Sequence, residues 1–154
     1  MEQIRDCNRW DFNRIQYHSE WPWMLSTGKR MSIADDPVRP ELSLDFRLSH
    51  GREIYTTFNA VVCVAYCDDI PAEVSDLNKM AGLHNAIFYT IWSYKKGAGR
   101  DMIDLMQNYL QTSKPYLKRF VTLSPKTEMA HKFHIKNGAF VFRKNETSVN
   151  YEYK

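Results

Sequence analysis

The sequence lacks the features that mark several large classes of protein. No apolar run approaches the length of a membrane span, and the N-terminal stretch MEQIRDCNRW contains no signal-peptide core. The three cysteines have no metal-type spacing, which indicates free thiols in a reducing compartment rather than disulfides or a metal site. The net charge of +3 falls short of the basic stripe of a dedicated nucleic-acid-binding protein. We therefore expect a cytoplasmic protein without metal, membrane or nucleic-acid partners, whose charge suits a small anionic ligand.

What the sequence does contain is typical of an ordinary globular domain. Hydrophobic residues make up 44% of its 154 residues and charged residues 25%. We expect a single domain over residues 1–154, with an aromatic N-terminal segment at 1–41 and a core at 42–154; the sequence leaves a homodimer possible. The N-terminal aromatic residues, which alternate with arginines, are Trp10, Phe12, Tyr17, Trp21 and Trp23. The stretch up to Pro22 favours a helix packed on the core, with a lid, a partner surface and a nucleic-acid stacking platform as alternatives.

The hydrophobic pattern beyond residue 41 predicts a mixed α/β domain. Alternating apolar residues predict half-buried strands, and runs that are apolar on both parities predict strands covered on both faces. The expected strands span residues 42–48, 58–67, 86–93, 119–123, 139–143 and 149–153. The expected helices are a short one after Pro71, an amphipathic one around 102–110 and one at 127–136.

The segment YKKGAGR predicts a phosphate-binding turn. Gly97 and Gly99 would let the backbone approach an oxygen closely, and free N–H groups at the start of the next helix favour an anion. The segment matches neither a Walker A motif nor a Rossmann fingerprint, and a simple tight turn is the alternative. It does resemble the Gln/Arg-x-x-Gly-x-Gly/Ala turn of the GCN5-related N-acetyltransferase (GNAT) superfamily, which cradles the pyrophosphate of coenzyme A. This resemblance implies coenzyme A contacts at Trp92, Ser93, Tyr94, Lys95, Lys96, Gly97, Ala98, Gly99 and Arg100.

Two residues of the stretch VTLSPKTEMAHKFHIKNGA allow two interpretations. In one, Ser124 before Pro125 caps a helix and His134 is an exposed helical residue. In the other, both belong to an active site. A helix that begins near Ser124 would separate the two by roughly 15 Å, so a direct pair requires the chain to turn before the helix starts. His131 shares a helix face with His134, but no third ligand indicates a metal site.

Several segments, in order, resemble the catalytic domain of malonyl-CoA decarboxylase, a divergent GNAT-fold enzyme. They are VVCVAYCDDIP, LHNAIFYTIWSYKKGAG, RFVTLSP, FHIKNGAFVFRKN and VNYEY, within residues 42–153. The resemblance implies that Ser124 and His134 are catalytic, with Tyr151 and Asn150 positioning the imidazole. The chain departs from the family pattern in having Lys-Thr-Glu after Ser-Pro, and in lacking a helical insertion between the serine and histidine motifs.

The resemblance implies a GNAT-like fold, with a central, mostly antiparallel sheet flanked by helices. It further implies an acyl-CoA-dependent enzyme that converts malonyl-CoA to acetyl-CoA and carbon dioxide, with a coenzyme A thioester as substrate. One alternative is an N-acetyltransferase that moves the acyl group of acetyl-CoA to an amine, with Tyr94 or Tyr151 as the acid. Another is a non-catalytic GNAT-fold binding protein that uses the aromatic N-terminus.

Overall fold

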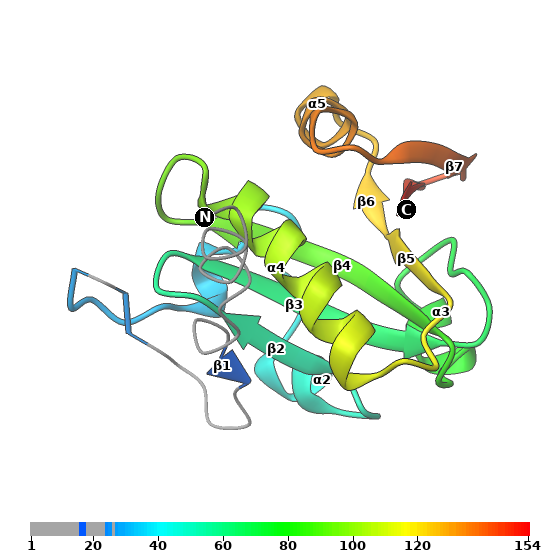
Figure 1. Ribbon diagram of the computed structural model, residues 1–154, viewed down its shortest axis with the longest axis horizontal. Helices are drawn as coiled ribbons and strands as arrows, with labels where there is room; N and C mark the ends of the chain where they lie inside the picture. Colours follow the sequence, from blue (N-terminus) through cyan, green and yellow to red (C-terminus); the bar gives the residue numbers. More distant parts are fainter. Residues whose placement is uncertain (1–15, 18–23, 26) are drawn as a thin grey trace, which may run out of the picture.

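The computed structural model describes residues 16–17, 24–25 and 27–154 of the chain (Figure 1). Its elements follow in the order β1 (Gln16–Tyr17), the 3₁₀ helix η2 (Ile33–Asp35), α2 (Leu44–Leu48), β2 (Glu53–Thr56), β3 (Ala60–Cys67), α3 (Asp76–Lys79), β4 (Asn85–Ser93), α4 (Ala98–Ser113), β5 (Arg119–Thr122), β6 (Ser124–Pro125), α5 (Glu128–Lys136), β7 (Phe140–Lys144) and β8 (Ser148–Tyr153). The fold is therefore mixed α/β, as the hydrophobic pattern predicts.

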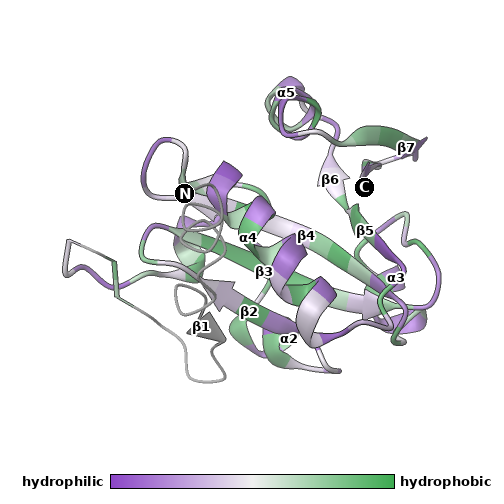
Figure 2. Cartoon of the chain, in the orientation of Figure 1, coloured by the Kyte–Doolittle hydropathy of each residue, from purple (hydrophilic) through white to green (hydrophobic). Residues whose placement is uncertain are grey.

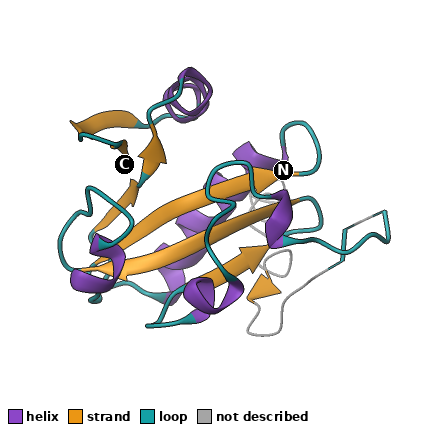
Figure 3. Cartoon of the chain, turned by 180° about the vertical axis from the view of Figure 1, so that it is seen from behind, coloured by secondary structure: helices purple, strands orange, loops and turns teal. Residues whose placement is uncertain are grey.

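The strands form one sheet in the order β1-β2-β3-β4-β5-β8-β6, and β7 pairs with β8. Among the strands of the described residues, only the pairing of β4 with β5 is parallel, so the prediction of a mostly antiparallel sheet is confirmed. Helix α4 lies across one face of this sheet, and α2 and α3 lie on the other face (Figures 1 and 3). The helices thus flank the sheet.

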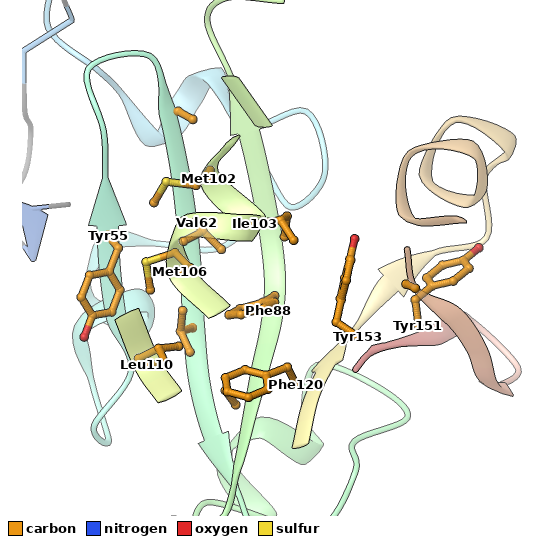
Figure 4. Packing of buried hydrophobic residues seen from close by; sticks show 14 of the residues in the cluster. Tyr55, Val62, Phe88, Met102, Ile103, Met106, Leu110, Phe120, Tyr151 and Tyr153 are labelled. Atoms are coloured by element: carbon orange, nitrogen blue, oxygen red, sulfur yellow. The ribbon is translucent and has the colours of Figure 1, made fainter. Parts of the chain in front are cut away.

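The core has two halves because successive side chains of a strand point to opposite faces. On β3, Val62 and Val64 pack toward α4, whereas Val61 and Cys63 pack toward α2 and α3. Figure 4 shows the apolar side chains of α4 against β3 and β4, and Figure 2 shows hydrophilic residues on the outer side of α4. Cys63 and Cys67 are buried free thiols, which agrees with the sequence prediction.

Residues 42–48, predicted as a strand, contain the helix α2 instead. The Ser43 side chain accepts a hydrogen bond from the backbone N–H of Phe46, which caps the N-terminus of the helix. Leu44 and Leu48 also fit a helical spacing of four, so the alternating pattern was ambiguous over so short a stretch. The strand that pairs antiparallel with β3 at this edge is β2, which the sequence analysis did not predict.

The prediction of an N-terminal helix is wrong for the two residues of that stretch that the structure describes. Gln16 and Tyr17 form β1, paired antiparallel with Thr56 and Tyr55 of β2. The rest of the predicted helix and most of its aromatic residues lie outside the described residues.

The sheet forks between its two parallel strands. The ladder of β4 and β5 pairs only Asn85–Phe88 with Arg119–Thr122. Tyr89 is an extra residue in β4, because Phe88 pairs with Val64 and Thr90 with the adjacent Cys63. A bulge of this kind bends its strand and can end pairing on one side. Beyond it, β6, β7 and α5 diverge from β4 and α4, as Figure 1 shows.

Candidate active site

A cavity of about 450 Å³ lies in this fork. The elements that line it are the end of β4, the start of α4, one side of α5 and the loop around residues 35–38. Its lining residues are Asp35, Pro37, Val38, Ile91, Trp92, Ser93, Gly99, Thr127, Met129, Ala130, Phe133 and His134. Segments far apart in the sequence therefore share one hollow, and it includes part of the predicted coenzyme A turn and the predicted catalytic histidine.

The glycine-rich turn has the backbone that the sequence predicts. Gly97 adopts a left-handed conformation, with φ of 85°, and α4 begins at the next residue. A Cβ at Gly99 would lie 3.2 Å from the ring of Phe133 on α5, so the absent side chain permits the close approach of the two helices. The Ala98 N–H bonds the Lys95 carbonyl at 3.1 Å, so the N–H groups that follow it in the first turn of α4 lie at the fork, where the helix dipole favours an anion.

The other predicted coenzyme A residues divide between two places. Trp92 and Ser93 line the large cavity, whereas Lys95, Lys96 and Ala98 line a second hollow of about 240 Å³ beside the β2–β3 turn. The remaining ones are Tyr94, whose hydroxyl donates to Asp35 at 2.7 Å, Gly97, and Arg100 in the first turn of α4.

Ser124 and His134 are in direct contact. Ser124 Oγ lies 3.2 Å from His134 Nε2, and both residues are buried. The expectation that a helix starting near Ser124 would separate them by roughly 15 Å is wrong, because α5 begins only at Glu128. Ser124 lies in β6, paired with β8, and Thr127 caps the helix by accepting a hydrogen bond from the N–H of Ala130. The interpretation of Ser124 as a helix cap is therefore also wrong.

Two tyrosines of β8 hold the imidazole of His134. Tyr153 Oη lies 2.7 Å from Nδ1, and the ring of Tyr151 stacks on the imidazole with centroids 5.0 Å apart. Tyr151 thus has the expected contact, while its hydroxyl is 3.2 Å from Nδ1 of His131. The sequence analysis missed Tyr153, although residues two apart on a strand share a face, so the pattern YEY carried the signal.

Asn150, predicted to position the imidazole, holds backbone instead. Its Nδ2 donates to the carbonyls of Pro71 and Thr122, at 2.9 and 2.8 Å, and its Oδ1 accepts from Asn145. These bonds join β8 to β5 and to the loop before α3. The prediction was wrong because Asn150 and Tyr151 alternate in direction along the strand.

Burial sets the protonation state of His134. Removal from water lowers the pKa of its imidazole to about 4, because burial disfavours the charged form. The side chain is therefore neutral at pH 7, with one nitrogen available as an acceptor.

The polar loop that follows η2 braces the fork. Arg39 donates to the carbonyls of Tyr89 and Leu123, at 3.3 and 3.0 Å, where the β4–β5 ladder ends. Asp36 pairs with Arg47 at 2.9 Å, and both side chains are fully buried. The guanidinium of Arg39 thus replaces the ladder bonds that the divergence removes.

The described residues contain neither a grouped set of metal ligands nor a helix that could span a membrane. Within residues 24–25 and 27–154, no three or more His, Cys, Asp or Glu side chains are grouped to hold a metal ion. None of the helices in the described part of the chain has the length and apolarity to cross a membrane.

Lowering the pH should destabilise the fold through His134. An unfolded histidine has a pKa near 6.5, against about 4 in the folded protein, so the unfolded chain binds more protons between these values. Stability should therefore fall as pH decreases through this window, by about 3 kcal/mol from this residue. Urea titrations at pH 7 and pH 4.5 would measure the loss, with His134→Gln expected to show less of it. The same pH dependence in His134→Gln as in the wild type would contradict this assignment.

Comparison with known proteins gives a likeness of fold. No family model and no curated protein matches the sequence. Among solved structures, the chain is similar to the crystal structure of malonyl-CoA decarboxylase from Agrobacterium vitis, with a TM-score of 0.55 and 21% identity, over 84% of this chain and 38% of that one. A second similar structure is malonyl-CoA decarboxylase from Cupriavidus metallidurans, with a TM-score of 0.48 and 25% identity, over 80% of this chain and 33% of that one.

The likeness to the Agrobacterium vitis structure shows that this chain shares the fold of part of that protein. The chain spans well under half the length of either structure.

Proposed function

We propose that this protein binds a coenzyme A thioester in the fork between β4 and α5 and decarboxylates a malonyl group. The observation that carries the proposal is the contact between Ser124 Oγ and His134 Nε2 beside the cavity. The likeness of fold to a malonyl-CoA decarboxylase supports it. The bulge at Tyr89, the fork and the glycine turn before α4 also support the finer assignment to the GNAT type of fold.

The geometry suits a long anionic ligand that enters at the start of α4. Its pyrophosphate would lie on the N–H groups that follow Ala98 in the first turn of α4, with the charge of Lys95, Lys96 and Arg100 nearby. From there the thioester arm would follow the end of β4 through the cavity toward His134.

Decarboxylation breaks a carbon–carbon bond and leaves its electron pair on the α-carbon and the thioester oxygen. The enolate then needs one proton on carbon, so each turnover consumes one proton. The malonyl carboxylate would raise the pKa of the neutral His134, because a nearby negative charge favours the imidazolium. His134 would thereby take a proton from solvent and deliver it from Nε2 to carbon, while the Ser124 hydroxyl holds a substrate oxygen.

The test is to incubate the purified protein with malonyl-CoA and to quantify acetyl-CoA and carbon dioxide. We expect both products in equal amounts, without an acceptor amine. The exposed His84→Gln variant should behave like the wild-type protein, because His84 pairs with Asp68 at the surface. No acetyl-CoA above the non-enzymatic rate would refute the decarboxylase proposal, and no heat of coenzyme A binding in calorimetry would refute coenzyme A binding as well.

One observation favours acyl transfer to an amine as a second candidate. The Asp35 carboxylate lines the cavity and accepts a hydrogen bond from Tyr94. A carboxylate there suits a substrate ammonium group, and desolvation raises the pKa of Tyr94, which keeps its phenol protonated as an acid. This function predicts release of free coenzyme A from acetyl-CoA only when an amine is supplied, and its loss in Asp35→Asn.

A further inference from the structure

The hydroxyl of Thr122 is the starting point of a second network at the Ser124–His134 pair. Thr122 is completely buried on β5, and its Oγ1 accepts the backbone N–H of Tyr151 at 3.1 Å. The same oxygen lies 2.8 Å from Ser124 Oγ. Either hydroxyl could donate in this last contact, because a hydroxyl proton rotates to suit its partners.

The burial of Thr122 favours one direction. If Thr122 donates to Ser124 Oγ, the Ser124 proton points to His134 Nε2, 3.2 Å away, and every group is satisfied. If Ser124 donates instead, the Thr122 proton loses this acceptor in a site without water contact. A buried donor without a partner is costly, so the first direction is the stable one.

The other end of the network follows from this direction. Tyr153 Oη lies 2.7 Å from His134 Nδ1. Because Nε2 accepts from Ser124 in the favoured direction, the one hydrogen of the neutral imidazole is on Nδ1, and the oxygen of Tyr153 accepts it.

We propose that Thr122 is a positioning residue at the start of a one-way hydrogen-bond chain. The chain runs from the Thr122 hydroxyl through Ser124 and His134 to the oxygen of Tyr153. It fixes the neutral imidazole as the tautomer with hydrogen on Nδ1 and a free lone pair on Nε2.

The catalytic role of this hydrogen-bond chain rests on the proposed function. With Nδ1 already carrying hydrogen, the proton that decarboxylation consumes can add only to Nε2, the nitrogen that faces Ser124. The chain therefore places the transferable proton on the reacting side of the ring. With the opposite tautomer, the added proton would go to Nδ1, next to Tyr153.

Nitrogen-15 NMR of the imidazole at pH 7, on full-length protein labelled at histidine, tests the chain directly. The signals of His134 are assigned by their absence in His134→Gln. We expect hydrogen on Nδ1 and an unprotonated Nε2 in the wild type. Hydrogen on Nε2 would overturn the proposal, whether or not the protein decarboxylates malonyl-CoA, whereas the expected tautomer without decarboxylation would refute only the proposed function.

Variants of Thr122 provide the second readout. Thr122→Val should raise the share of the Nε2–H tautomer and lower kcat by about ten- to a hundredfold with little change in KM. Thr122→Ser keeps the hydroxyl and should retain both tautomer and rate. An unchanged tautomer or a wild-type kcat in a folded Thr122→Val would each contradict the chain; should Thr122→Val not fold, the wild-type spectrum decides.

Discussion

Replacing His134 by glutamine should lower the rate of malonyl-CoA decarboxylation by about two to four orders of magnitude, the usual contribution of a positioned acid or base. Glutamine has a similar reach and can still accept a hydrogen bond from Ser124, but it cannot carry the proton that the enolate needs. Because His134 lies at the acyl end of the proposed ligand path, affinity for coenzyme A should change little. Steady-state kinetics with malonyl-CoA and calorimetry with coenzyme A measure the two effects separately.

The control for His134→Gln is the same substitution at His84, which lies at the surface in contact with Asp68. It should leave rate and affinity as they are. Wild-type decarboxylation in a folded His134→Gln protein would remove His134 from the mechanism. A joint loss of rate, coenzyme A binding and cooperative melting would instead show that the substitution unfolds the protein, and Ser124→Ala would then test the pair.

The second large effect concerns the buried pair that holds the loop at the fork. Arg47→Met should destabilise the protein by about 3–5 kcal/mol, because it leaves the Asp36 carboxylate buried without its partner. Asp36 also accepts from the Thr90 hydroxyl and from the N–H groups of Val38 and Arg39. Loss of Arg47 therefore also weakens the loop that places Arg39 between the two strands.

Urea unfolding followed by circular dichroism would measure the free energy of unfolding. The control is Lys132→Met, which removes an exposed pair with Glu128 on α5 and should cost about 0.3–0.5 kcal/mol. The double variant of Arg47→Met with Asp36→Asn should lose less free energy of unfolding than the two single variants lose in sum, because no unpaired charge remains buried. A loss in Arg47→Met no larger than in the control would show that the pair does not hold the loop.

The sequence alone predicted the elements whose local pattern is unambiguous. β3 and β4 are long apolar runs, and α4 has a clear amphipathic repeat after a glycine turn, so burial and backbone preferences act in the same direction. The five residues of α2 fit both periods, and the sequence could not distinguish them. Order and motif likeness also singled out Ser124 and His134 before their contact was known.

Tertiary structure decided how these residues meet. The 3.2 Å contact depends on the turn between β6 and α5, in which the Thr127 N–H bonds the Pro125 carbonyl, and on the pairing of β6 with β8, which spacing along the chain does not encode. Thr122, Tyr153 and Arg39 join the site through hydrogen bonds to residues that are 29, 19 and 84 positions away in the sequence, respectively. Local sequence determines which faces are buried; the bulge, the fork and the strand pairing determine which buried groups lie within hydrogen-bond distance, because they set the distances between elements rather than within them.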